Sequence, residues 1–162
     1  MAKALVVEYD NCTGCGLCVM LCPFAHAGEF NPARSRIRLA RVPEEGTIIP
    51  NVCYQCAAPA PCIESCPTDA ITRNDTTGAL IIDYELCTSC EACISACPYD
   101  NILQDPQTGD IIKCDFCGGD PECVKYCAYD VLRFVEADEA ALARVEAIKQ
   151  EISKLLATGT VR

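Results

Sequence analysis

Short apolar segments, separated by polar turns, occupy the first 136 residues of this 162-residue chain. Most are only three to five residues long and rich in Val, Ile and Leu, which predicts short strands rather than helices. The predicted strands are residues 5–9, 70–73, 80–83, 111–113 and 131–135. The stretches 74–78 and 105–110 are rich in Asn, Asp, Thr and Gly and predict hairpin turns.

The pattern changes after Glu136. Residues 138–157 predict one helix, opened by acidic residues and followed by Gly159 as a cap. Such a helix either packs on the body of the protein or docks a partner subunit or another copy of the chain. Because the preceding modules look too small to need it, we expect an interface. Its apolar seam, with four-three spacing, consists of Ala141, Val145, Ile148, Ile152 and Leu155.

Sixteen cysteines form four groups of four and identify the chemistry. The groups are Cys12, Cys15, Cys18, Cys22 (I); Cys53, Cys56, Cys62, Cys66 (II); Cys87, Cys90, Cys93, Cys97 (III); and Cys114, Cys117, Cys123, Cys127 (IV). Groups I and III have the spacing C-x2-C-x2-C-x3-C-P, by which bacterial ferredoxins bind [4Fe–4S] clusters, and groups II and IV widen its middle spacing. With four thiolates per cluster and none left over, we predict four [4Fe–4S] clusters.

Zinc sites and disulfides are the alternatives. Paired C-x2-C motifs bind zinc, but zinc ribbons do not need a third cysteine after two residues, a fourth after three, and a proline. Disulfide scaffolds belong to secreted proteins, and residues 1–8 lack the apolar stretch of a signal peptide. The longest apolar runs are also far too short for a membrane span. We therefore expect a cytoplasmic iron–sulfur protein.

Composition and charge narrow the partners. Six Tyr, four Phe and no Trp leave a thin apolar core, so we expect cluster binding to supply folding free energy and the apo chain to be largely unfolded. The formal net charge is −10, and clusters carrying about two negative charges each bring the loaded protein to about −18. Nucleic acid is therefore not an expected partner, whereas basic or neutral protein faces are.

The groups follow an A-B-A′-B′ repeat, in which residues 6–15 resemble 81–90 and residues 52–71 resemble 113–132. In two-cluster ferredoxins the fourth cysteine of one run binds the other cluster, so the groups must pair. Either neighbours pair in sequence, or II pairs with III inside a pair of I with IV. The predicted hairpin between groups II and III, and the first and last strands around them, favour nesting.

Nesting defines the fold class as α+β, with two fused, pseudo-duplicated bacterial-type 2[4Fe–4S] ferredoxin modules and a C-terminal helix. The outer module is residues 1–50 and 98–136, the inner module is 51–97, and the interface helix is 137–162. The ligand sets are Cys12, Cys15, Cys18 with Cys127; Cys22 with Cys114, Cys117, Cys123; Cys53, Cys56, Cys62 with Cys97; and Cys66 with Cys87, Cys90, Cys93.

Two further features stand outside the cysteines. Arg34, Arg36 and Arg38 alternate with other residues and predict a strand with a basic face, which neutralises cluster charge, docks an acidic partner or is simply solvated. The only histidine, His26, is interpreted as a loop residue, with a potential-tuning hydrogen bond as the alternative. Prolines that follow groups I to III are expected to end a local helix, and Ala128 breaks that pattern in group IV.

The four nested groups resemble the four-cluster iron–sulfur subunits of molybdenum and tungsten oxidoreductases, and of some hydrogenase and carbon monoxide dehydrogenase systems. Residues 22–37 are similar to the segment after the first cysteine group in small electron-transfer subunits of tungsten aldehyde oxidoreductase-type enzymes and related aromatic-acyl-CoA reductases. The resemblance implies a non-catalytic subunit that passes electrons between a tungsten- or molybdenum-pterin subunit and a second redox partner, a flavoprotein or a ferredoxin.

Other functions stay open. The chain is alternatively a free soluble polyferredoxin, or the equivalent subunit of a hydrogenase, formate dehydrogenase or carbon monoxide dehydrogenase system. A redox sensor would carry a DNA- or ligand-binding element, and the sequence contains none that we recognise. Self-association through the C-terminal helix is a further expectation.

Overall fold

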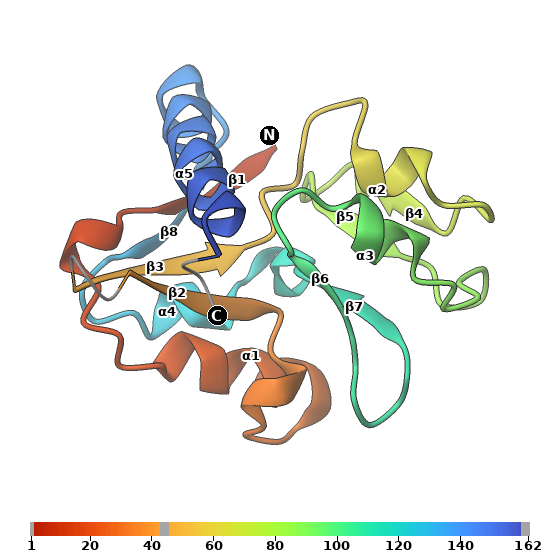
Figure 1. The fold of residues 1–162 in the computed structure, drawn as a ribbon, viewed down its shortest axis with the longest axis horizontal. Coiled ribbons are helices and arrows are strands. Elements are labelled where there is room, and N and C mark those ends of the chain that lie inside the picture. Colours follow the sequence, from red (N-terminus) through yellow and green to blue (C-terminus); the bar gives the residue numbers. More distant parts are fainter. Residues whose placement is uncertain (1, 43–45, 160–162) are drawn as a thin grey trace.

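The structure is a computed structural model that describes residues 2–42 and 46–159. Within these ranges the strands form four separate two-stranded sheets, all antiparallel (Figure 1). Figure 1 shows two lobes, one with β1, β8, β2, β3 and the long helix α5, the other with α2, β4, β5 and α3. The hairpin of β6 and β7 lies between them.

The two strand pairs that favoured nesting are both present. β1 (Lys3–Val7) pairs with β8 (Leu132–Glu136), so the first strand meets the last across almost the whole chain. β4 (Ile71–Arg73) pairs with β5 (Leu80–Ile82) around the predicted turn. In that turn the Asn74 side-chain oxygen accepts the backbone N–H groups of Thr76 and Thr77, both at 2.9 Å, which holds the reversal.

Two strands, β3 (Thr47–Val52) and β6 (Ile102–Gln104), were not predicted. β3 pairs with β2 (Ile37–Val42), and β6 pairs with the predicted β7 (Ile111–Lys113) around the predicted turn. β3 contains Pro50, which removes a backbone donor and argues against a central strand; a two-stranded sheet has only edges and tolerates it. β6 was missed because its three residues carry too little pattern.

A helical segment carries the third cysteine of every group. These segments are α1 (Leu17–Ala27), α2 (Pro61–Glu64), α3 (Ala92–Ala96) and α4 (Glu122–Lys125). The 3₁₀ turns are η1 (Tyr9–Asn11), η2 (Pro32–Arg34) and η3 (Phe116–Gly119). Proline was expected to end the helix of group I, and this was wrong: α1 continues through Pro23 for four more residues. Burial of Pro23 offsets the lost backbone bond.

Two hydrophobic cores form, and their border differs from the expected domain boundary. The inner core contains Ala60, Cys62, Ile71, Leu80, Cys93, Ile102 and Ile111. Ile102 and Ile111 come from β6 and β7, which we had assigned to the outer module. In the other direction, Cys53 and Tyr54 pack in the outer core. The packing border therefore crosses the expected boundaries at residues 50/51 and 97/98.

Helix α5 (Glu139–Ala157) confirms the predicted C-terminal helix. The Asp138 side chain caps it by accepting the Ala141 N–H at 2.8 Å, and Gly159 follows with φ +66°. The helix packs against β1 (Figure 1). No helix in the described ranges is both long and apolar enough to cross a membrane.

The expectation that the α5 seam docks a partner or a second copy was wrong. All five seam residues are buried in the outer core of the chain itself, with Ile152 fully buried. The reason lies in β1, where residues 4–7 are all buried, so both faces of this strand need cover. A two-stranded sheet cannot supply that cover, and α5 does.

The basic strand predicted from Arg34 begins only at Ile37, with Arg34 in η2. Arg34 binds the buried Asp105 carboxylate (Nε–Oδ2 2.8 Å) and also Glu29. In the same way Arg36 pairs with Asp115 (2.9 Å) and Arg38 with Asp100 (2.7 Å). The arginines therefore neutralise carboxylates of this chain. The reading as a merely solvated face is wrong for Arg34 and Arg36, whose side chains are largely buried, but fits the half-exposed Arg38. Docking of an acidic partner stays a prediction.

Replacing Ile152 by Ala should lower the free energy of unfolding by about 2–5 kcal/mol, because the cavity would lie where α5 covers β1. The matched control is Leu142→Ala on the same helix, where the side chain is half exposed and the expected loss is below about 1 kcal/mol. Anaerobic urea unfolding followed by circular dichroism measures both. Equal losses would contradict packing of this seam on the body.

Candidate iron–sulfur centres

The first centre joins the two ends of the cysteine pattern. Gly14 and Gly16 adopt φ +68° and +77°, which lets the loop turn between its cysteines, and a side chain at Gly14 would also collide with Ile48. The last cysteine of group IV reaches this loop because β8 pairs with β1. One small apolar pocket is consequently lined by Cys12, Cys15, Cys18 and Cys127.

The second centre lies between α1 and α4, which pack together. Cys22 and Cys123 project from these helices, and both are buried. Burial raises the pKa of the Cys123 thiol, and the neighbouring Cys22 and Cys117 thiolates raise it further. Burial likewise raises the pKa of the Cys114 thiol, and the charges of Cys53 and Cys123 add to the rise. Cys22 and Cys123 thus lie on two helices that pack together, and Cys114 and Cys117 belong to the segment that leads into α4.

The third centre lies where group II meets the end of group III. Its surroundings include the edge-to-face pair Tyr54–Tyr99, with ring centroids 5.1 Å apart, and buried Asn101. The Asn101 backbone N–H points at the Cys97 sulfur, 3.5 Å away. One pocket is lined by Cys53, Cys56, Cys62 and Cys97.

The fourth centre lies in the inner lobe beside the β4–β5 hairpin. Although burial alone would raise the pKa of the Cys66 thiol, hydrogen bonds from the Thr68 backbone and hydroxyl lower it, so this loop favours a thiolate. The turn depends on Asp69, which adopts φ +55°. One pocket is lined by Cys66, Cys87, Cys90 and Cys93.

The donor set fits iron–sulfur clusters. Burial raises the pKa of Cys18 to about 12, and the charges of Cys12, Cys15 and Cys127 add to the rise while a backbone hydrogen bond from Val19 opposes it. Four converging thiolates repel one another unless cations lie between them, so iron must displace the protons of such thiols. Backbone N–H groups aimed at sulfur, such as Arg36 N at 3.3 Å from Cys22 Sγ, match what thiolate-bound clusters accept.

His26 lies on helix α1 rather than in a loop, which corrects the prediction. Its Nδ1 lies 2.8 Å from the Cys22 carbonyl oxygen and its Nε2 lies 3.0 Å from Asp115 Oδ1. Because both ring nitrogens face oxygen acceptors, the ring is the doubly protonated form. Burial would lower the pKa of His26, but hydrogen bonds to Asp115, Cys117 and Cys22 raise it to about 12.

Asp115 connects this histidine to the loop of group IV. Its carboxylate also accepts the Cys117 N–H at 2.9 Å and the Arg36 guanidinium at 2.9 Å. Burial would raise the pKa of Asp115, but the bond to His26 and the charge of Arg36 hold it well below its usual range. His26, Asp115 and Cys117 together hold the second centre's loop in place. The only sequence signal for this role was the spacing of His26 four residues after Cys22.

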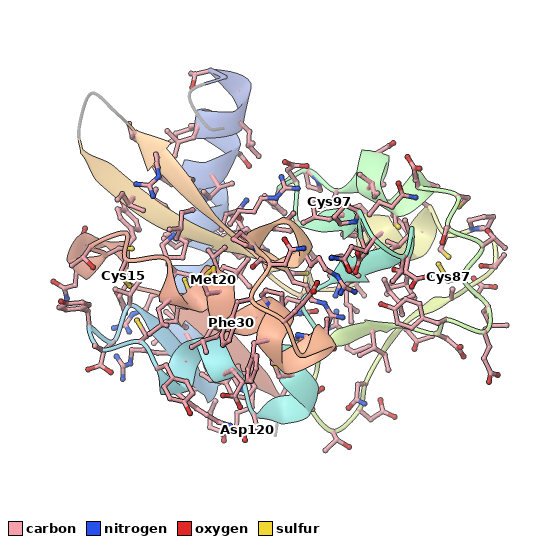
Figure 2. The ribbon with its side chains drawn as sticks, turned by 90° about the horizontal axis from the view of Figure 1, so that it is seen from below. Cys15, Met20, Phe30, Cys87, Cys97 and Asp120 are labelled. Atoms are coloured by element: carbon pink, nitrogen blue, oxygen red, sulfur yellow. The ribbon has the colours of Figure 1, made fainter. Side chains whose placement is uncertain are left out.

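Exposure differs along the molecule. Of the sixteen cysteines, only Cys15 and Cys90 are exposed, and each is the second cysteine of its group, in groups I and III. Exposed apolar side chains lie close to them in sequence or along the same pocket: Tyr126 and Tyr129 at the first centre, Tyr84 and Leu86 beside Cys87. Figure 2 places Cys15 and Cys87 toward opposite ends of the long axis. The first and fourth centres are thus the accessible ones.

Comparison with known proteins agrees with this chemistry. A family model described as a 4Fe-4S dicluster domain matches residues 45–137, and a second of the same description matches residues 11–71.

Two relatives align over most of their length. The aliphatic sulfonate oxidoreductase, polyferredoxin-like subunit, of Pyrococcus furiosus is 35% identical over 143 residues, covering 86% of this chain and 82% of the relative. The thiosulfate reductase electron transfer subunit of Salmonella typhi is 32% identical over 151 residues, covering 85% of this chain and 77% of the relative. Among solved structures, a chain of the active site complex of benzoyl coenzyme A reductase with benzoyl-CoA has 25% identity and a TM-score of 0.48, covering 93% of this chain and 90% of its own.

Removing iron with a chelator under anaerobic, reducing conditions should unfold most of the chain, because cysteines line both cores and metal binding is coupled to folding. Far-UV circular dichroism measures the loss, and adding back iron and sulfide should restore the signal. An apo chain that keeps its spectrum and still melts cooperatively would contradict this.

Proposed function

Because the chain belongs to the family of 4Fe-4S dicluster domain proteins, we propose that it is the electron-transfer subunit of an oxidoreductase complex and carries four [4Fe–4S] clusters in a row. The observation that carries the proposal is that three pockets are each lined by four cysteines drawn from two groups, and that α1 and α4, which carry Cys22 and Cys123, pack together. No thiol is left over for catalysis. The role is therefore non-catalytic.

The ligand sets that we propose are the nested ones. Cys127 closes the set of group I, Cys22 that of group IV, Cys97 that of group II, and Cys66 that of group III. Support comes from three pockets, which are lined by the complete sets of the first, third and fourth centres. At the second centre, support comes from the packing of α1 against α4. The residues form an outer module closed by β1 and β8 around an inner one closed by β4 and β5.

The four centres follow one another in a line. Helix α1 carries Cys18 of the first set and Cys22 of the second, and Gln55, which stands between Cys53 and Cys56 of the third set, donates to the Cys114 carbonyl of the second at 2.8 Å. The third and fourth sets share helix α2 with its following loop, which carries Cys62 and then Cys66. An electron entering at one accessible end therefore has one sequence of centres to the other end.

Two accessible ends suit two partners. We propose that one is a catalytic subunit with a tungsten- or molybdenum-bound pterin, and the other a flavoprotein or ferredoxin. Two observations support this: residues 22–37 resemble subunits of tungsten enzymes, and two relatives are themselves subunits of an aliphatic sulfonate oxidoreductase and of a thiosulfate reductase. The acidic surface of a chain with net charge −10 favours basic faces on both partners.

A free polyferredoxin is the second candidate, and one observation favours it. The C-terminal helix, predicted to be a subunit interface, has its apolar seam buried on its own chain. With this seam covered by its own chain, the helix offers no apolar face for a permanent partner subunit, as expected of a carrier that diffuses alone.

Anaerobic purification of the untagged protein from its source tests the choice. We expect about sixteen irons per chain, with a large subunit that carries tungsten or molybdenum eluting in the same fractions. About sixteen irons in a protein that elutes alone would support the free carrier. Zinc with little iron would refute both candidates.

Serine substitutions test the nested pairing, because a serine ligand shifts the electron paramagnetic resonance signal of its own cluster. Cys22→Ser and Cys123→Ser should alter one and the same signal, whereas Cys127→Ser should alter a different one. Sequential pairing gives another result: Cys22→Ser would alter the same signal as a substitution in group II, such as Cys53→Ser.

A further inference from the structure

Lys113 places a positive charge in the interior. The residue is 3% exposed at the end of β7, directly before Cys114. Its Nζ donates to the carbonyl oxygens of Leu80 and Cys114, the latter at 2.9 Å, and lies 3.3 Å from Gln55 Oε1. Three acceptors use all three hydrogens of an ammonium group, which a neutral amine could not provide. Lys113 is therefore a buried cation.

No carboxylate forms an ion pair with this ammonium among residues 2–42 and 46–159. A buried charge without a counter-charge is costly, and neutral carbonyl oxygens compensate only part of that cost. The negative groups nearby are cysteine sulfurs. Lys113 lowers the pKa of Cys62 and Cys114, opposing the larger effect of burial, which raises both.

The cation lies where the second and third centres meet. Gln55 stands between Cys53 and Cys56 of the third centre, and its amide donates to the Cys114 carbonyl of the second at 2.8 Å. Gln55 Oε1 also accepts the Leu80 N–H at 2.7 Å. Lys113 thus belongs to a network that fastens the loops of these two centres to each other and to β5.

The internal repeat shows that ferredoxin loop geometry does not demand this lysine. The residue equivalent to Lys113 in group II is Val52, which is also buried and also directly precedes the first cysteine. The same backbone position therefore tolerates an apolar side chain. The charge at Lys113 needs a reason other than the shape of the loop.

We propose that Lys113 is an electrostatic positioning residue for electron transfer: its ammonium raises the reduction potentials of the second and third clusters and so allows an electron to cross between the modules. Reduction takes one electron from a neighbouring cluster and adds one negative charge to the acceptor cluster, with no bond broken. A fixed cation stabilises the more negative state and reduces the repulsion between two adjacent anionic clusters. The inference rests on the proposed function, because it needs those clusters to be present.

The test is a redox titration of Lys113→Met followed by electron paramagnetic resonance. Methionine keeps most of the length of the side chain and removes its charge. We expect the signals of the second and third clusters to shift to more negative potentials, and those of the first and fourth to move less. The matched control is Lys125→Met, which removes an ammonium within group IV that is exposed and already paired with Asp120 and Glu122. The cluster reduction potentials of this variant should stay at the wild-type values.

A second variant covers the case in which the first does not assemble. Gln55→Glu keeps Lys113 and adds a carboxylate beside it, so it should also shift the two interior potentials in the negative direction. Unchanged potentials in an iron-replete variant overturn the inference, and so does loss of iron from both variants, which would indicate a purely structural role. A wild-type protein without about sixteen irons would instead refute the proposed function itself.

Discussion

In the ligand sets proposed above, the last cysteine of each group joins the other group of its module, and this crossing is the constraint on which the rest of the structure depends. Cys127 must reach the loop of group I, and Cys22 must reach the loop of group IV, although these two groups are about a hundred residues apart in the sequence. The chain meets this demand by pairing β1 with β8 and packing α1 against α4. The inner lobe meets the same demand over a shorter distance with β4 and β5. The sheets themselves contain only two strands each.

Charge is the second constraint, because sixteen thiols converge in a chain that is already acidic. Burial raises the pKa of many of them, and the structure counters this with backbone N–H groups and with a few interior cations. Arg36 and His26 surround the Asp115 carboxylate beside the second centre, and Lys113 stands between the second and third. These cations lie largely buried, where water screens their fields least.

The ends of the line are built differently from its middle. Cys15 and Cys90 are exposed, and five of the six buried cysteines belong to the second and third centres: Cys22, Cys53, Cys62, Cys114 and Cys123; the sixth, Cys93, belongs to the fourth centre. Accessible centres permit docking and electron exchange with partners, and buried ones keep the electron within the chain. The helix α5 does not take part in this division, since its apolar seam stabilises β1. Membership of the dicluster family, and relatives that are themselves subunits of oxidoreductases, agree with an iron–sulfur electron-transfer subunit.

The cysteine spacing by itself determined the chemistry of this protein, because ligand geometry around a cluster is local and only a few residues long. Turn residues and strand patterns likewise predicted the hairpin of β4 and β5, the partner of β1, and the extent of α5. Three matters depended on the tertiary structure. The face that the α5 seam covers, the carboxylates that the three arginines neutralise and the burial of Lys113 all involve partners distant in sequence. Lys113 and Leu80 are 33 residues apart, and the pairs of Arg34, Arg36 and Arg38 with Asp105, Asp115 and Asp100 are 62 to 79 residues apart. A side chain's periodicity shows that it has a face to bury or a charge to pair, but only the folded chain decides which distant segment lies against it.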